Sequence, residues 1–233
     1  PTVTYKKIDG KDRFFLYFAN SGNGIGVLTA DHPVGPYTDP LGEALVTRAT
    51  PNCADVVWLF DPAVLVDDDG KAYLYFGGGV PEGKEEMPNT GRVVQLGDDM
   101  ISLAGTPQVV EAPWFFEAAF VNKIGDTYYY SYCTNWAERP AGKDAPEKAV
   151  IAYMTSDNPL GPWEYQGVIF RNPGVYFGSY GNNHHSFVEF NGKWYFFYHT
   201  RLLENIMGIS AGYRSTHVEE MTITADGVIQ PVK

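Results

Sequence analysis

The chain has 233 residues, 44% of them hydrophobic and 15% aromatic, which is enough to build one large core over residues 1–233 as a single domain. Its formal net charge of -11 disfavours nucleic acids and anionic membranes as partners, and no apolar stretch approaches the roughly 18 to 20 residues that cross a bilayer. The 25 glycines and 16 prolines predict many turns between short strands, as in an all-β protein, and a neutral sugar polymer agrees with the charge.

A hairpin pattern recurs about every sixty residues along the chain. Each copy has a polar residue, a short apolar run, a turn with glycine and an aromatic-rich strand, which predicts two antiparallel strands joined by a tight turn. The four copies are "TVTYKKIDGKDRFFLYF" from Thr2, "DPAVLVDDDGKAYLYFG" from Asp61, "EAAFVNKIGDTYYYSYC" from Glu117 and "HHSFVEFNGKWYFFYHT" from His184.

Further strands extend these hairpins. "TADHPVGPY" from Thr29 and "TSDNPLGPW" from Thr155 each follow an apolar strand and end in a Pro/Gly turn. About four strands per repeat predicts the blades of a β-propeller around a central channel, with a β-sandwich as the alternative. The tail from Glu219 contains another short hairpin, which we expect to act as a closing strand. Because Pro1 already lies in the first strand of a repeat, we expect an N-terminal blade to be missing from this chain.

One position of the repeat carries four different side chains. Thr2, Glu117 and His184 lie eight residues before their turn glycines, and Asp61 lies nine before its own. The start of each inner strand faces the channel of a propeller, so we expect these positions to converge on one pocket. Buried carboxylates cost several kcal/mol unless they are paired, so Asp61 and Glu117 brought together indicate a functional site. Paired carboxylates in a cleft are typical of glycoside hydrolysis.

The whole chain resembles a family of carbohydrate-cleaving enzymes. The motifs that carry the resemblance are "FDPAVLVDDDGKAYLYFGG", "EAAFVNKIGDTYYYSYC", "GNNHHSFVEFNGKWYFFYHT" and "AGYRSTHVEEM", which together are similar to family 43 glycoside hydrolases. The resemblance implies a five-bladed β-propeller that inverts configuration at the anomeric carbon. Four blades and a closing strand would then be visible in this N-terminally incomplete chain.

The resemblance also implies a role for each matching residue. Glu117 resembles the general acid, and Asp61 resembles the third carboxylate, which raises the pKa of that acid and orients it. His184 matches the channel histidine that lies beside a calcium ion or a water cluster, and Arg214 matches an arginine that contacts the sugar. The general base of the family is an Asp near the start of the first inner strand, where the first visible repeat has Thr2. We therefore expect a missing N-terminal fragment to carry the base.

The function that follows is removal of α-L-arabinofuranosyl groups from arabinoxylan or xylo-oligosaccharides, with β-xylosidase activity in the same pocket. Within the family, an arabinanase is a further option. The rival from another class is a non-catalytic carbohydrate-binding propeller that lost its base. Cys53 and Cys133 fit two buried thiols or one bridge, and no signal segment follows Pro1, so a cytoplasmic and a secreted location both stay open.

Aromatic residues near the predicted blade ends are candidates for stacking on sugar rings, since an aromatic face suits the apolar side of a sugar. These are Trp58, Trp114, Trp136 and Tyr176, of which Trp58 and Trp114 are the ones we assign to the substrate. The alternative for each of them is ordinary packing at the rim or in the core.

Other polar residues receive a structural interpretation. Glu111 is the rival for the acid role but lies fourteen residues before the turn glycine, so it belongs to the preceding loop. The run Asp67–Asp69 lacks the spacing of a calcium loop and predicts a solvated hairpin turn. His199 and His217 are expected to be structural.

Overall fold

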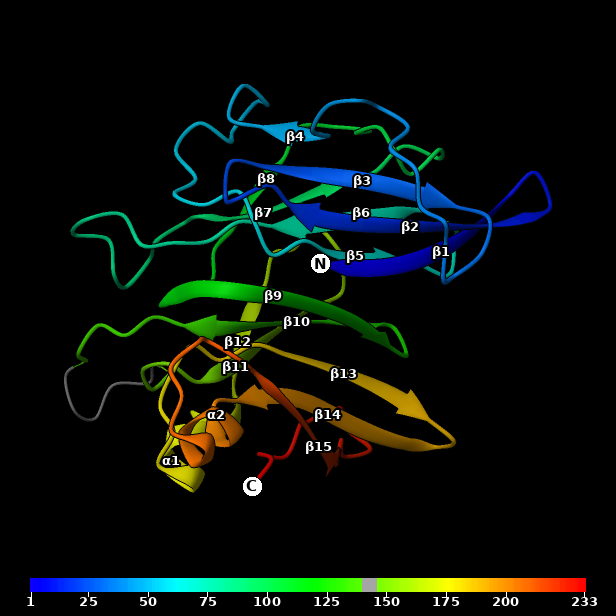
Figure 1. The fold of residues 1–233 in the computed structure, drawn as a ribbon. Coiled ribbons are helices and arrows are strands. Elements are labelled where there is room, and N and C mark those ends of the chain that lie inside the picture. The colour runs from blue at the N-terminus through cyan, green and yellow to red at the C-terminus, as the bar shows by residue number, and fades with distance from the viewer. Residues whose placement is uncertain (140–145) are drawn as a thin grey trace.

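Four antiparallel sheets surround a common axis in the computed structural model, which describes residues 1–139 and 146–233 (Figure 1). The first sheet contains β1 (Thr2–Ile8), β2 (Lys11–Ala19), β3 (Gly24–Ala30) and β4 (Val46–Thr47). The second contains β5 (Ala63–Val66), β6 (Ala72–Phe76), β7 (Gly91–Gln95) and β8 (Gln108–Val110). The third contains β9 (Phe115–Ile124), β10 (Thr127–Thr134), β11 (Ile151–Ser156) and β12 (Glu164–Phe170). The fourth contains β13 (His185–Phe190), β14 (Lys193–Thr200) and β15 (Ser215–Met221).

The strands within each sheet follow chain order, so each sheet is one blade of a propeller. The first two strands of every blade form a hairpin, which confirms the repeat predicted from the sequence. Gly10 and Gly70 in two of these turns have φ of 77° and 80°, a backbone conformation that only glycine adopts without strain. Two short helices, α1 (Pro173–Phe177) and α2 (Leu202–Met207), lie beside the last blade (Figure 1).

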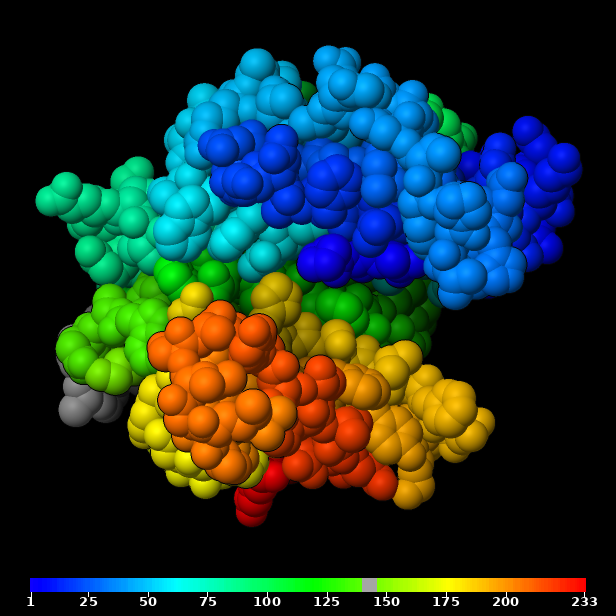
Figure 2. Space-filling model, viewed as in Figure 1, coloured from blue at the N-terminus to red at the C-terminus, as the bar shows by residue number. Residues whose placement is uncertain are grey.

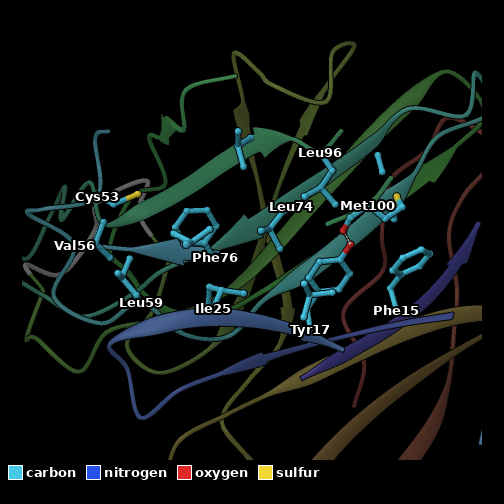
Figure 3. Close-up of a cluster of buried hydrophobic side chains, with 14 residues drawn as sticks. Phe15, Tyr17, Ile25, Cys53, Val56, Leu59, Leu74, Phe76, Leu96 and Met100 are labelled. Carbon is cyan, nitrogen blue, oxygen red and sulfur yellow. Dashed lines mark hydrogen bonds between the residues drawn. The ribbon is translucent and has the colours of Figure 1, made fainter. Parts of the chain in front are cut away.

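Three apolar cores occupy the three junctions between successive blades. In the first, Phe15 and Tyr17 of β2 pack against Leu74 and Phe76 of β6, and the Tyr17 hydroxyl donates to the Met100 carbonyl oxygen at 2.6 Å (Figure 3). The second core joins the blades of β6 and β10, and the third joins those of β10 and β14. Blades that bury their faces in this way hold their innermost strands, β1, β5, β9 and β13, around one axis.

The C-terminal tail does not act as the expected closing strand. The backbone N–H of Val232 donates to the carbonyl oxygen of Ile169 at 2.8 Å, and Val232 forms a bridge with Phe170 of β12. Ile229 and Val232 are buried in the third core. The tail therefore covers the outer edge of the third blade, because its apolar side chains find an apolar partner there.

Two further expectations can be compared with the structure. Cys53 and Cys133 are buried and unbridged, which confirms two free thiols. Among the described residues, no helix is both long and apolar enough to span a bilayer.

The Asp67–Asp69 run is only partly the solvated turn that the sequence predicts. The Asp67 side chain is 6% exposed and accepts hydrogen bonds from Lys123 Nζ at 2.7 Å and from the Tyr128 hydroxyl at 2.5 Å. Lys123 also pairs with the exposed Asp68 at 2.9 Å. This cluster joins the β5–β6 turn to the β9–β10 hairpin, at the ends of β5 and β9 that lie opposite Asp61 and Glu117.

Asp67→Asn should destabilise the protein by about 1–3 kcal/mol, since it leaves the half-buried Lys123 and the buried Tyr128 poorly paired. Burial raises the pKa of Asp67, but the hydrogen bonds from Lys123 and Tyr128 outweigh it and hold the pKa below its ordinary value of 3.8. The stability that Asp67 contributes is thus complete above pH 3.8 and is lost as the pH falls further. Urea unfolding at pH 7 and at pH 3 measures the loss of unfolding free energy that the substitution causes at each pH. An equal loss at the two pH values would contradict the ionised, hydrogen-bonded role of Asp67.

Candidate active site

The beginnings of the four innermost strands meet at a cavity of about 400 Å³ on the propeller axis. Its walls include Thr2 of β1, Ala63 of β5, Ala119 of β9 and His184 beside β13. Thr2 and His184 thus face one cavity, while Asp61 and Glu117 are not among its lining residues and lie beside it, next to Pro62 and close to Ala119 along the chain. Thr2 offers a hydroxyl at this position and no carboxylate.

Asp61 connects three of these strands at the axis. Its Oδ2 accepts a hydrogen bond from the backbone N–H of Ala118 at 3.0 Å and lies 3.9 Å from Nδ1 of His184. Asp61 has φ of 48°, in the left-handed region that Asp tolerates better than most residues and that is enriched at functional sites. The following Pro62 begins the turn into β5, so the backbone itself directs this carboxylate towards the axis.

Glu117 reaches the axis through an irregularity in β9. The pairing of β9 with β10 shifts register on both sides of the Glu117–Cys133 pair, and Ala118 has φ of 61°. Bulges of this kind re-aim side chains next to active sites. Glu117 is 7% exposed, and within the described residues no hydrogen bond reaches its carboxyl group. A strand of aromatic and small residues thus carries one buried acid.

The surroundings of Glu117 favour its protonated form. Burial, and then the negative charge of Asp61, raise the pKa of Glu117 from 4.5 to about 7, while the positive charge of Arg214 opposes the rise. A carboxyl group with this pKa keeps much of its proton near neutral pH. It can therefore donate a proton to a bound molecule, which an ordinary Glu, ionised above pH 4.5, does poorly.

Arg214 is presented by the segment between α2 and β15. Its guanidinium is exposed, and Nη1 donates to the carbonyl oxygen of Gly212 at 2.6 Å. The positive charge of Arg214 lowers the pKa of Glu117, against the effects of burial and Asp61. A guanidinium beside an axial acid can donate hydrogen bonds to hydroxyl groups of a ligand.

His199 also lines this cavity, although the sequence analysis assigns it a structural role. Its Nδ1 is buried and has no partner among the described residues. Burial, with Arg214 and His184 nearby, lowers the pKa of His199 to about 4, so its imidazole is neutral near pH 7. Side chains alternate along the strand "KWYFFYHT", so His199 faces the opposite side from the buried Phe196 and Tyr198. This alternation could have identified His199 as a cavity residue from the sequence.

His185 and His217 make contacts between strands, which agrees with the structural role expected for His217. His185 is buried and its Nε2 lies 2.6 Å from the Ser131 hydroxyl. His217 pairs through Nε2 with the Thr200 hydroxyl at 2.9 Å and stacks on Tyr198. The first contact joins β13 to β10, and the second joins β15 to β14.

The surroundings of His184 contain buried polar atoms that lack partners among the described residues. Calcium takes six to eight oxygen ligands, yet within residues 1–139 and 146–233 no group of three or more His, Cys, Asp or Glu side chains is arranged to hold a metal ion. Asn183 is fully buried, and its amide oxygen and nitrogen both lack partners among these residues. Buried polar groups of this kind are usually satisfied by ordered water.

The four candidate aromatic residues differ in what they expose. Trp58 is 38% exposed and packs edge-on against Phe116, the neighbour of Glu117, at 5.6 Å between ring centroids. Trp114 is only 7% exposed, and the guanidinium of Arg139 covers its ring at 4.2 Å, so it offers little surface to a ligand. Trp136 is 39% exposed, and Tyr176 stacks on Phe170 beside α1. Of these four residues, Trp58 is the one that is exposed and also contacts a neighbour of Glu117.

Glu111, the alternative acid, is exposed in the segment between β8 and β9. An exposed carboxyl group lacks the burial that raises the pKa of Glu117. The geometry thus favours Glu117 over Glu111 as a proton donor.

Glu117→Gln should change how stability depends on pH. In the wild type, the pKa of Glu117 is about 7 in the folded state and 4.5 ordinarily. The folded state therefore holds this proton more tightly than the unfolded state, and the stability that Glu117 contributes is complete below pH 4.5 and is lost as the pH rises to 7. The glutamine variant cannot ionise. The unfolding free energy of the variant minus that of the wild type should therefore rise by roughly 3 kcal/mol across this window. Urea unfolding between pH 4 and 8 measures this difference in unfolding free energy. The variant Glu111→Gln, at an exposed position, corrects for the loss of one charge. A corrected difference that does not change with pH would contradict the raised pKa of Glu117.

Comparison with known proteins gives a consistent picture. The model of Glycosyl hydrolases family 43 matches residues 6–229. An arabinoxylan arabinofuranohydrolase of Bacillus subtilis is 51% identical over all of this chain and 46% of its own length. An arabinoxylan arabinofuranohydrolase of Paenibacillus polymyxa is 49% identical over all of this chain and 37% of its own length. The chain thus spans less than half of these curated relatives.

A solved structure agrees with this relationship. The crystal structure of a family 43 arabinoxylan arabinofuranohydrolase from Bacillus subtilis, in complex with cellotetraose, superposes with a TM-score of 0.93 at 51% identity. The match covers 98% of this chain and 48% of that one. With its axial carboxyl pair and this match along nearly the whole sequence, the chain belongs to glycoside hydrolase family 43.

Proposed function

We propose that this chain carries the catalytic acid of an inverting α-L-arabinofuranosidase that acts on arabinoxylan or its oligosaccharides. The observation that carries the proposal is Glu117, an acid buried at the propeller axis beside Asp61, with a pKa of about 7. Two relatives at about 50% identity are arabinoxylan arabinofuranohydrolases. One relative binds cellotetraose, a β-1,4-linked chain like the backbone of xylan, which supports a polysaccharide substrate.

Each residue then has a defined part in the reaction. Glu117 gives its proton to the glycosidic oxygen as the bond to the sugar breaks. The negative charge of Asp61 raises the pKa of Glu117 and so helps it to hold that proton until the bond breaks. Arg214 donates to hydroxyl groups of the sugar, and Trp58 offers an aromatic surface at the rim, with Trp114 a weaker candidate. A water molecule attacks the anomeric carbon from the opposite face, which requires a general base roughly 6.5–9.5 Å from Glu117.

A fifth blade would supply this base. The first blade leaves Val3 and Tyr5 of β1 exposed at 53% and 59%, and the last blade leaves Val188 and Val218 exposed at 49% and 50%. Every other blade face packs into one of the three cores, so these two are the uncovered apolar faces of the ring in the described chain. Between them lies a furrow, bounded by blue and orange residues in Figure 2. A blade inserted here would bury both faces and bring its inner strand beside Thr2.

Sugar specificity is the finer part of the proposal. The names of the two relatives favour arabinofuranose, and β-xylosidase activity in the same pocket is the second candidate because the two sugars present similar hydroxyl arrangements. A calcium ion beside His184 stays a prediction, and water would have to provide most of its ligands.

Hydrolysis of arabinoxylan oligosaccharides by the longest protein that contains this chain tests the function. We expect release of arabinose by the wild type, and a fall of roughly 10²- to 10⁴-fold for Glu117→Gln with sugar binding retained. A 4-nitrophenyl arabinofuranoside provides the matched control. Its leaving group departs without a proton, so the variant should lose much less activity on it. Equal losses on both substrates would remove Glu117 from the acid role, and binding without any hydrolysis would favour the carbohydrate-binding propeller.

Asp61→Asn should lower the alkaline limit of activity. The negative charge of Asp61 raises the pKa of Glu117, so its removal lowers that pKa and Glu117 loses its proton at a lower pH. Asn keeps an oxygen for the Ala118 N–H and tolerates the positive φ of this position. The pH dependence of kcat/KM measures the shift, and an unmoved alkaline limb would argue against this role for Asp61.

A further inference from the structure

The segment that presents Arg214 has no regular structure of its own. Helix α2 ends at Met207 and is capped by Gly208, which has φ of 68°, and residues 209–214 run from there to the start of β15. Ile209 and Tyr213 in this segment are 38% and 64% exposed, so apolar packing does little to fix it. A guanidinium that must meet a ligand at a defined position needs another constraint on its backbone.

That constraint is a buried carboxylate that the sequence analysis did not single out. The Glu204 side chain, on α2, has no exposed surface. Its Oε1 accepts from Arg201, through Nε at 3.0 Å and through Nη2. Its Oε2 accepts from the backbone N–H groups of Ala211 at 3.1 Å and Tyr213 at 2.6 Å. Four donors thus surround one carboxylate, two from the helix start and two from the segment.

These bonds end immediately before Arg214. The Tyr213 N–H is fixed by Glu204, and the next residue carries the guanidinium that acts on Glu117. Arg214 also donates to the Gly212 carbonyl oxygen, which lies between the two N–H groups that Glu204 holds. Glu204 therefore fixes the backbone immediately before Arg214 through one short, hydrogen-bonded turn.

We propose that Glu204 is a positioning residue that fixes the 209–213 turn so that Arg214 faces Glu117 and the bound sugar. This inference rests on the proposed function, in which Arg214 binds the substrate. Glu204 itself touches neither the sugar nor the reacting atoms. An ion pair that only anchors α2 would stabilise the fold without affecting the axial acid, and this difference can be measured.

The test is Glu204→Gln. Glutamine has the same shape, but its amide nitrogen must face either Arg201 or the backbone N–H groups, so one set of donors loses its acceptor. If the turn moves, Arg214 leaves Glu117 and the pKa of Glu117 rises above about 7, because Arg214 lowers it in the wild type. A ¹³C NMR titration of the Glu117 carboxyl follows this directly. Arg214→Gln should raise the same pKa, and Glu204→Gln should add nothing further in that background.

Asp67→Asn is the matched control for the loss of a buried, hydrogen-bonded carboxylate. It should lower stability and leave the pKa of Glu117 unchanged. If Glu204→Gln does not fold, Glu204→Asp keeps the charge but is too short to reach both donor sets, so a smaller rise is expected. An unchanged pKa in folded Glu204→Gln, or a rise of equal size with and without Arg214, would overturn the proposal.

Enzyme activity provides the second measurement. It separates the positioning role of Glu204 from the proposed glycosidase function. For an active wild type, kcat/KM on arabinoxylan oligosaccharides should fall roughly tenfold in Glu204→Gln, and its alkaline limb should move to higher pH. The titration requires no turnover. A protein that hydrolyses nothing but shows the pKa rise would contradict the proposed function and leave the positioning role of Glu204 supported.

Discussion

The face-to-face packing of successive blades determines everything else in this structure. Each of the three cores joins one sheet to the next in chain order, and together they hold β1, β5, β9 and β13 around one axis. Residues at equivalent starts of these strands then meet, although they are more than fifty residues apart in sequence. Asp61, Glu117 and His184 are neighbours for this reason, and no local segment could bring them together.

The same packing creates the chemical property of the site. Burial beside a second carboxylate opposes the ionisation of Glu117, which is a cost to the folded state near neutral pH and an advantage for a proton donor. The surroundings maintain this arrangement with local constraints. Asp61 accepts from the Ala118 N–H, the bulge in β9 directs Glu117 inward, and Glu204 fixes the turn before Arg214. At Glu117, the fold therefore accepts a loss of stability near neutral pH and gains a group that can donate a proton.

Much of this was predictable from the sequence, because the repeat is local. Glycines such as Gly70 and Gly125 define the hairpin turns, and counting back from them identified the axial residues. What could not be predicted depends on contacts between distant segments. The burial of Asp67 depends on Lys123 of another blade. The role of Glu204 depends on a turn that has no regular sequence pattern. The C-terminal tail packs against β12 through apolar side chains and a backbone hydrogen bond.

The proposed reaction depends on a Glu117 that keeps its proton near neutral pH at the propeller axis. A ¹³C NMR titration of the Glu117 carboxyl in the wild-type chain tests this directly, with the assignment taken from the spectrum of Glu117→Gln, in which the signal is absent. We expect a midpoint near pH 7. A midpoint near 4.5, the ordinary value, would mean that the carboxyl group is solvated and unaffected by Asp61, and would contradict the account.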